Sequence, residues 1–429
     1  MKTLVVGSGG REHALALALS RDPGSPEVHA APGNPGIGEV ATLHEVDPMD
    51  GAAVADLAER LGVDLVVVGP EAPLVAGVAD AVAERGIACF GPSREAARLE
   101  GSKAFSKEVM AAAGVPTAAS RACSTAEEVE AALDAFGPPY VVKDDALAAG
   151  KGVVVTTDRD EALAHGASCD RVVVEEFLDG PEVSLFAVCD GTSVRPFQPA
   201  QDFKRIRDGG RGPNTGGMGS YTPLPWAPPG LTDEVVRTVV QPTVDEMAAR
   251  GTPFQGLLFV GLALTARGPR VIEFNVRFGD PETQSLLALL SSPLADLLHA
   301  AARGRLDDAE APELRDGAAV TVVLASAGYP ASSSSGDVIS GLDEAGGRDG
   351  VDVIHAGTAT DGEHVVTAGG RVLAVTAVGE DVADARRRAY DAADLVSFDG
   401  AQRRTDIAAE PLGAVESRAV TDADQKVHP

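Results

Sequence analysis

The chain has 429 residues, which is long for a single core, and its 44% hydrophobic residues, 48 glycines and 28 prolines are typical of an α/β enzyme. Its formal net charge of −28 excludes sequence-independent binding of nucleic acid, which depends on clustered Lys and Arg. The four cysteines show neither CxxC pairing nor the density of a disulfide scaffold. No stretch has the length of a signal peptide or a membrane span, so we expect a cytoplasmic protein without a membrane partner.

The first hundred residues alternate between strand and helix patterns. Strands are predicted at "TLVVG", "VHAA", "DLVVVG" and "ACFG", and the helices between them at "REHALALALS", "GAAVADLAERLG" and "PLVAGVADAVAERG". This order predicts a parallel sheet with right-handed crossovers, in a domain that we place at residues 1–101. A further helix over 103–113 ends before "GVP".

The next part of the chain predicts two lobes and a small last domain. Residues 117–188 contain a β hairpin and a helix capped by Ser124 or Thr125. Helices are then expected near 233–250 and 283–303, with the strands "GLLFVGLALT" and "RVIEFNVRF" between them, followed by short strands and a helix over 381–394. We place a large lobe at 102–120 with 190–327, a small lobe at 121–189, a C-terminal α+β domain at 328–412 and a poorly ordered tail at 413–429.

The hairpin carries "KDDALAAGKGVVV", residues 143–155. Its tip of Ala, Gly and Lys can bring backbone N–H groups and an ammonium close to an anion. It is not a Walker loop, because no Ser or Thr follows Lys151 and a strand follows in place of a helix. Lys103, Lys143 and Lys151 would each be surface lysines by default, but Lys143 ends a strand that reads as buried.

The first glycine-rich loop, in "VVGSGGREHAL", lies between a strand and a helix, so helix N-terminal amides face an anion there. A nicotinamide-binding fold would place an acidic residue at the end of the second strand, where this chain has Ala30, Ala31 and Pro32. Two other interpretations of this loop remain. It binds a phosphate with help from Arg11, or its glycines serve only a tight turn. The loops containing Asn34 and Glu71 end neighbouring strands and can line the same crevice.

The strongest local signal is "RVIEFNVRFGDPETQ", residues 270–284. Alternate side chains of a strand share a face, so Glu273, Asn275 and Arg277 should point one way while Ile272, Phe274 and Val276 pack behind. A carboxylate and an amide two residues apart offer the oxygen ligands that Mg²⁺ takes alongside substrate phosphates. The alternative is a solvated strand face, which would not require the polar set to continue through Arg277 and Asp280.

Seven segments in this order resemble the phosphoribosylamine–glycine ligase family of the ATP-grasp superfamily: "GSGGREHAL", "PGNPG", "GPEAPL", "GSKAFSK", "LAAGKGV", "GPNTGGMGSYTP" and "RFGDPETQ". The likeness covers about residues 1–412, and the last two segments are the specific ones. It implies an α/β fold with an N-terminal parallel-sheet (pre-ATP-grasp) domain, a two-lobed ATP-grasp α+β domain and a small C-terminal α+β domain.

The resemblance also implies a reaction: ATP, glycine and 5-phosphoribosylamine give glycinamide ribonucleotide, ADP and phosphate through a glycyl phosphate, with Mg²⁺ or Mn²⁺. ATP-binding residues would be Lys103, Lys143, Lys151, Gly152, Glu175, Glu176, Phe177, Leu178 and Glu182. Glu273 and Asn275 would bind the metal, and Arg277, Gly279 and Asp280 the glycine, with Arg277, Asp280 and Lys143 catalytic. Around phosphoribosylamine would lie Gly9, Gly10, Arg11, Asn34, Glu71, Asp202, Lys204, Gly217, Met218 and Gly219.

The chain departs from the family pattern at Asp144 and Ala146 in the hairpin, and at Gly210 and Arg211, where an acidic residue is common. The strand "GLLFVGLALT" offers no carboxylate to a metal. Competing hypotheses are another ATP-grasp carboxylate–amine ligase, a nucleotide-binding regulatory protein with a decayed site, and a reductase. The partners expected are small-molecule substrates only, and we expect a monomer.

Overall fold

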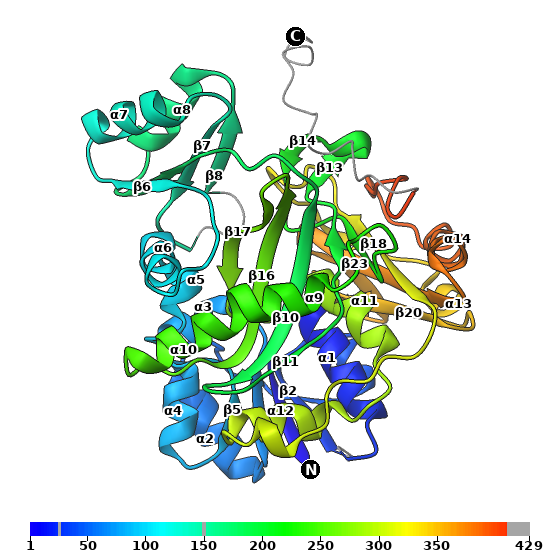
Figure 1. Ribbon diagram of the computed structural model, residues 1–429. Coiled ribbons are helices and arrows are strands. Elements are labelled where there is room, and N and C mark those ends of the chain that lie inside the picture. The colour runs from blue at the N-terminus through cyan, green and yellow to red at the C-terminus, as the bar shows by residue number, and fades with distance from the viewer. Residues whose placement is uncertain (25–26, 148–151, 410–429) are drawn as a thin grey trace.

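The computed structural model describes residues 1–24, 27–147 and 152–409. The tail at 413–429 lies outside the described residues. Figure 1 shows a parallel-sheet domain at the N-terminus, a central sheet above it, a small lobe projecting to one side and a C-terminal domain on the other. No helix in these described ranges is long and apolar enough to cross a membrane.

The N-terminal domain is built on a five-stranded parallel sheet with strand order β3-β2-β1-β4-β5. The strands are β1 (Lys2–Gly7), β2 (Glu27–Pro32), β3 (Thr42–Leu43), β4 (Leu65–Val68) and β5 (Ala88–Phe90). The helices are α1 (Gly10–Arg21), α2 (Gly51–Leu61), α3 (Glu71–Ala76) and α4 (Val78–Glu84). The predicted topology is confirmed, although the third predicted helix is two helices, because Gly77 adopts a left-handed conformation between them.

The small lobe is a four-stranded sheet with order β6-β9-β7-β8 and two helices on it. Its elements are β6 (Ser120–Cys123), α7 (Ala126–Phe136), β7 (Tyr140–Asp144), β8 (Val153–Thr156), α8 (Arg159–Ala167) and β9 (Val172–Glu175). Thr125 caps α7 by accepting from the amide of Glu128. β7 and β8 pair antiparallel, as the predicted hairpin requires.

The large lobe carries the central sheet, with order β11-β10-β16-β17. Its strands are β10 (Glu182–Asp190), β11 (Val194–Pro196), β16 (Gln255–Thr265) and β17 (Gly268–Asn275), and its helices are α5 (Arg98–Gly101), α6 (Lys103–Ala112), α9 (Leu231–Val235), α10 (Gln241–Ala249), α11 (Glu282–Leu289) and α12 (Leu294–Ala302). We had placed β10 in the small lobe, but all nine of its residues pair with β16, so the small lobe ends before Glu182. The helix predicted over 283–303 is two helices, α11 and α12, separated by Leu290 to Pro293.

The C-terminal domain shares its main sheet with the preceding segment, in the order β12-β15-β18-β23-β20. Its elements are β12 (Gln201–Asp202), β13 (Arg205–Arg207), β14 (Arg211–Asn214), β15 (Gly219–Thr222), β18 (Ala318–Ala325), β19 (Ser335–Val338), α13 (Leu342–Gly346), β20 (Val351–His355), β21 (Thr358–Asp361), β22 (His364–Ala368), β23 (Arg371–Gly379) and α14 (Val382–Ala393). β18 pairs with β23 along its length, so the C-terminal domain begins with β18 at Ala318, ten residues before the expected boundary at 328. The loop before β15 is thereby fixed to the C-terminal domain.

A buried histidine pair joins the first and last domains. The backbone N–H of His355 in β20 donates to Nδ1 of His13 in α1 (2.7 Å), and the two rings meet edge to face with centroids 5.7 Å apart. Burial, with the neighbouring His355, lowers the pKa of His13 to about 3, and burial lowers that of His355 to about 4. Both rings are therefore neutral in the folded protein at neutral pH.

Acid should weaken this junction. Below pH 6.5 the unfolded chain binds protons at both histidines and the folded chain does not, so their contribution to stability is present above pH 6.5 and is lost as the pH falls toward 4. We expect the melting temperature to fall more steeply between pH 6.5 and 5 in the wild type than in His13→Asn. His364→Asn, at an exposed site, is the control and should keep the wild-type slope. Parallel slopes for wild type and His13→Asn would contradict the assignment.

Candidate active site

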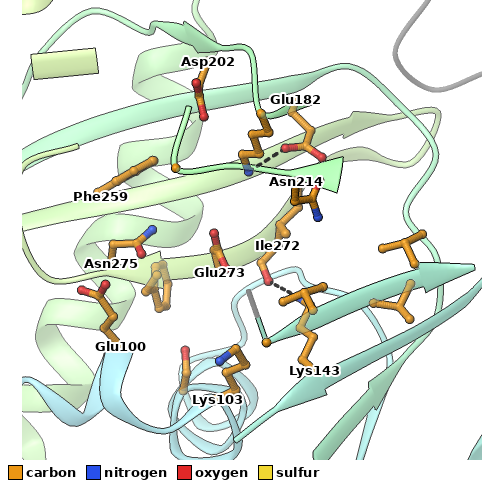
Figure 2. Close-up of a pocket in the computed structure, with 18 of the residues that line it drawn as sticks. Glu100, Lys103, Lys143, Glu182, Asp202, Asn214, Phe259, Ile272, Glu273 and Asn275 are labelled. Atoms are coloured by element: carbon orange, nitrogen blue, oxygen red, sulfur yellow. Dashed lines mark hydrogen bonds and ion pairs between the residues drawn. The ribbon is translucent and has the colours of Figure 1, made fainter. Parts of the chain in front are cut away.

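A cavity of about 410 Å³ lies where the hairpin, β17 and the N-terminal domain meet, and Figure 2 shows its lining. Most of the residues selected from the sequence line it: Arg11, Glu71, Lys103, Lys143, Gly152, Glu175, Glu176, Phe177, Leu178, Glu182, Asp202, Lys204, Glu273, Asn275, Arg277 and Asp280. They come from the N-terminal domain and from both lobes. Lys151 lies outside the described residues.

A β-bulge in β17 shapes the floor of the cavity. Glu273 pairs with Gly261 and Val271 with Leu262, so Ile272 is the extra residue without a partner on β16. The simple alternation predicted from sequence is therefore wrong at Ile272, which lines the cavity beside Glu273, while Val271 and Phe274 pack in the core. The bulge also leaves the Ile272 carbonyl free to accept from Nζ of Lys143 (2.9 Å; Figure 2).

Glu175 lies between two lysines at the boundary of the lobes. Its Oε2 is 3.0 Å from Nζ of Lys143, and its Oε1 is 3.0 Å from Nζ of Lys107. Nζ of Lys107 also donates to Oγ1 of Thr117 and to the Ala118 carbonyl. Among the described residues, Lys143 contacts Glu175 and Ile272. An ammonium has three donors, so one N–H has no partner in this part of the chain and can serve a ligand. The Glu175 side chain thus serves to hold Lys143.

The base of the hairpin is attached to the start of α6. Oδ1 of Asp145 accepts from Oγ of Ser102 (3.1 Å) and the amide of Ala104 (2.9 Å). Nζ of Lys103 donates to the Ala146 carbonyl (3.0 Å). Burial, opposed by Glu273 and reinforced by Lys143, lowers the pKa of Lys103. Among the described residues only Ala408 has positive φ outside glycine, so alanine at 146 introduces no backbone strain.

Glu273 and Asn275 form the candidate metal ligands. Burial alone would raise the pKa of Glu273, but Lys204, Lys143 and other nearby cations hold it below its usual value, so it is ionised. The facing residue of β16 is Gly261, which confirms that this strand adds no carboxylate. No cluster of three His, Cys, Asp or Glu suited to a metal occurs in the described ranges. One carboxylate and one amide fit Mg²⁺ or Mn²⁺ that completes its shell with phosphate and water oxygens.

Arg277 and its neighbours form a buried charge cluster beside the metal ligands. Its Nε lies 3.2 Å from Oε2 of Glu71, and its Nη2 lies 3.1 Å from Oε1 of Glu100 and 3.3 Å from Oδ1 of Asn275. Burial raises the pKa of Glu100, although Arg277 opposes this. Burial would also raise the pKa of Glu71, but Arg277 and Arg11 hold this pKa below its usual value. Arg277 is thus fixed in orientation by both flanking carboxylates.

The N-terminus of α1 is already occupied by carboxylates of the protein. The amide of Gly9 donates to Oε2 of Glu12 (2.6 Å), and that of Arg11 to Oδ2 of Asp280 (3.4 Å). A Cβ on Gly10 would lie 2.8 Å from Nε2 of Gln284. The Arg11 guanidinium turns inward, donating to Oε1 of Glu12 and to the Phe278 carbonyl. The glycines therefore permit close packing against Asp280, and the Arg11 side chain is not a free anion receptor.

Five more residues selected from the sequence lie outside the lining of the cavity. Met218 is in the core with Ile206 and Val323. Asn34 uses its amide on the Ser8 and His355 carbonyls. Gly217 has φ +109°, and a Cβ there would meet Pro281, while a Cβ on Gly219 would meet the neighbouring strand. Gly279 packs against Glu282 in the same way. Their roles are to bring the loop and the Asp280 turn together.

Glu182 and Lys204 close the far end of the cavity. Nζ of Lys204 lies 2.8 Å from Oε2 of Glu182 (Figure 2). Burial would lower the pKa of Lys204, but Glu182 and Glu273 raise it above its usual value. Arg211 is exposed and bonds Asp208, while Gly210 lines the cavity.

The sequence reasoning missed several lining residues: Glu100, Lys107, Glu282 and Arg371. Burial raises the pKa of Glu282, whose Oε1 accepts from Oγ of Ser184 (3.1 Å). Glu282 stands inside "RFGDPETQ" and Lys107 inside "GSKAFSK", so two of them lay within segments already noted. Nothing local marked Glu100 or Arg371, which reach the site only through the packing of domains.

Two lobes that enclose lysines and a Glu–Asn pair, with a parallel-sheet domain alongside, define an ATP-grasp enzyme. The family descriptions "Phosphoribosylglycinamide synthetase, N domain", "ATP-grasp (A) domain" and "C domain" match residues 1–100, 101–283 and 319–410. The chain belongs to the phosphoribosylglycinamide synthetase family. It is 67% identical over 416 residues to the phosphoribosylamine–glycine ligase of Streptomyces coelicolor, covering 96% of this chain and 100% of the relative.

Solved structures agree with the fold. A phosphoribosylamine–glycine ligase from Thermotoga maritima superposes with a TM-score of 0.83 at 34% identity, covering 95% of this chain and 100% of that one. The biotin carboxylase domain of Hydrogenobacter thermophilus 2-oxoglutarate carboxylase gives 0.71 at 17% identity, covering 94% and 91%. The second likeness shows the shared fold alone.

Because the Glu175 side chain holds Lys143, Glu175→Gln should lower activity, although this side chain is not itself proposed to contact a substrate. Removing the charge leaves two buried ammonium groups facing each other. We expect kcat/KM for ATP to fall about ten- to a hundredfold, because this factor corresponds to the free energy contributed by one charged hydrogen bond. Asp134→Asn, which breaks an exposed ion pair in the same lobe, is the control and should behave as wild type. Unchanged ATP kinetics in Glu175→Gln would contradict this role.

Proposed function

We propose that this protein ligates glycine to 5-phosphoribosylamine at the expense of ATP, giving glycinamide ribonucleotide, ADP and phosphate, a step of purine biosynthesis. The observation that carries the proposal is the cavity in which the Lys103 and Lys143 ammonium groups converge with the oxygens of Glu273 and Asn275. The family of the chain supports the choice of substrates. The intact set of charged residues argues against a decayed regulatory site.

ATP is proposed to lie between the hairpin and β17. The free N–H of Lys143, and Lys103, would contact its phosphates, and residues 175–178, which follow β9, would present backbone groups to the adenine. Glu182, at the start of β10, would accept from the ribose hydroxyls once Lys204 moves aside. Lys151 and Gly152 belong to the hairpin that would cover the phosphates.

In the first step, a glycine carboxylate oxygen attacks the γ-phosphorus of ATP, forming an O–P bond as the bond to ADP breaks. This transfer needs positioning and charge stabilisation more than covalent help from the protein. Lys103 and Lys143 supply positive charge, and Glu273 with Asn275 would hold Mg²⁺ or Mn²⁺, which neutralises phosphate charge when bound. Arg277, oriented by Glu71 and Glu100, is the proposed partner of the glycine carboxylate.

In the second step, the amine of phosphoribosylamine attacks the acyl carbon, a C–N bond forms, and phosphate leaves. The substrate would enter from the side where Asp202, Lys204 and Asp280 line the cavity. Asp280 is ionised, because Arg371 and Arg11 overcome the effect of burial on its pKa. It is the proposed contact for the ammonium of glycine. Gly9, Gly10, Asn34 and residues 217–219 shape this end from behind.

Phosphate release tests the proposal. The wild-type protein with Mg²⁺, ATP, glycine and freshly made phosphoribosylamine should release phosphate, and omission of any one substrate should stop turnover. Full turnover without glycine but with another amino acid or carboxylate would favour the alternative, a different carboxylate–amine ligase. No turnover with the full set would refute the proposal.

The metal ligands predict a specific loss. Glu273→Gln keeps the shape and removes the charge, so kcat should fall by orders of magnitude while the melting temperature is retained. Glu363→Gln, at an exposed position in the C-terminal domain, is the control. Wild-type turnover by Glu273→Gln at ordinary Mg²⁺ would refute the metal assignment, and comparison of Mg²⁺ with Mn²⁺ identifies the preferred ion.

A monomer in the cytoplasm is part of the same proposal. The site draws its residues from three domains of one chain and its substrates are small and polar. Light scattering of the purified protein measures the mass in solution directly.

A further inference from the structure

Arg371 is the contribution of the C-terminal domain to the cavity. It is the first residue of β23, yet its side chain lines the cavity with Asp280 and Gly216. Its Nη1 donates to the carbonyls of Asp280 (2.5 Å) and Gly216 (2.6 Å), and its Nη2 lies 3.3 Å from Oδ2 of Asp280. A Cβ on Gly216 would lie 3.0 Å from the guanidinium carbon, so glycine at this position permits the close contact.

The hydrogen bonds leave one edge of this guanidinium open. A guanidinium has five N–H donors, and three are used in these contacts. The Nε–H and one Nη2–H have no partner among the described residues, and the side chain is 21% exposed. The Nε–Nη2 edge of a guanidinium matches two oxygens of a phosphate or carboxylate.

Arg371 lies at the phosphoribosylamine end of the cavity. The charged groups that act on it are Asp280, Asp202 and Arg11, together with Tyr329. Lys143 and Lys103, the lysines proposed to contact ATP, act on Glu273. Arg371 contacts the Asp280 turn directly, through the carbonyl and the carboxylate of Asp280.

The other cations near this end already face carboxylates of the protein. Arg11 lies beside both Glu12 and Glu71, and Lys204 is paired with Glu182. We propose that Arg371 binds the 5-phosphate of phosphoribosylamine through its open Nε–Nη2 edge, an inference that rests on the proposed function. The same residue joins the Asp280 turn to the loop at 216–217, so substrate binding and the placement of Asp280 are linked.

Kinetics of two variants test this assignment. Arg371→Gln removes the charge and Arg371→Lys keeps it without the fork. We expect the KM for phosphoribosylamine to rise about ten- to a hundredfold in Arg371→Gln, which is the loss expected for one charged hydrogen bond, and less in Arg371→Lys. The KM for ATP should be unchanged, and the KM for glycine should rise less than that for phosphoribosylamine, because Arg371 also pairs with Asp280. The control is Arg386→Lys, a C-terminal-domain arginine whose guanidinium also binds two backbone carbonyls but lies outside the cavity lining.

A stable probe separates the phosphate from the sugar. Ribose 5-phosphate should bind the wild type and Arg386→Lys in calorimetry and bind Arg371→Gln at least about tenfold more weakly. If Arg371→Gln unfolds at a lower temperature than the wild type, the same comparison is made with Arg371→Lys. Unchanged ribose 5-phosphate affinity and phosphoribosylamine KM, or a rise confined to the KM for glycine, would overturn the assignment. Failure of the proposed function is distinct, because the wild type itself would then release no phosphate.

Discussion

The site depends on one carboxylate, that of Asp280, which is held by groups from all three domains. Its Oδ2 accepts from the amide of Arg11 in the N-terminal domain and faces Arg371 of the C-terminal domain, while its Oδ1 accepts from Gln284 of α11. A buried ionised carboxylate is tolerated only when it is paired and hydrogen-bonded. Asp280 therefore fixes the positions of the domains around the cavity, and its neighbours Gly9, Gly10 and Gly217 are the residues that let the backbones approach.

The rest of the cavity is a balance of opposite charges taken from separate elements. Lys143 is set by Glu175 and the bulge carbonyl of Ile272, and Arg277 is set by Glu71 and Glu100. Each of these cations is oriented by protein groups before any substrate arrives. Such preorganisation is what a phosphoryl transfer requires, since little reorganisation remains to be made as charge develops.

Local sequence patterns gave most of the fold and most of the lining. The parallel sheet, the hairpin, the helix capped by Thr125 and the strands β16 and β17 follow from hydrophobic periodicity, capping and turn residues, and the structure confirms them. The resemblance to a family then predicted that Lys103, Glu182 and Asp202 belong to one site. What failed were boundaries set by pairing between distant strands: β10 joins β16, and β18 joins β23, which no local pattern specifies.

By itself, the sequence determined which residue types stand at the ends of strands and in turns, because strand period, caps and glycine turns are properties of neighbouring residues. Only the tertiary structure decided which of them have free donors. Arg11 was a candidate anion receptor and is paired with Glu12 and Glu71. Lys107 is paired with Glu175, and Arg371, far beyond the other lining residues in the sequence, has its side chain in the cavity. A hydrogen bond requires a partner within about 3 Å, and that distance is set by domain packing and not by spacing along the chain.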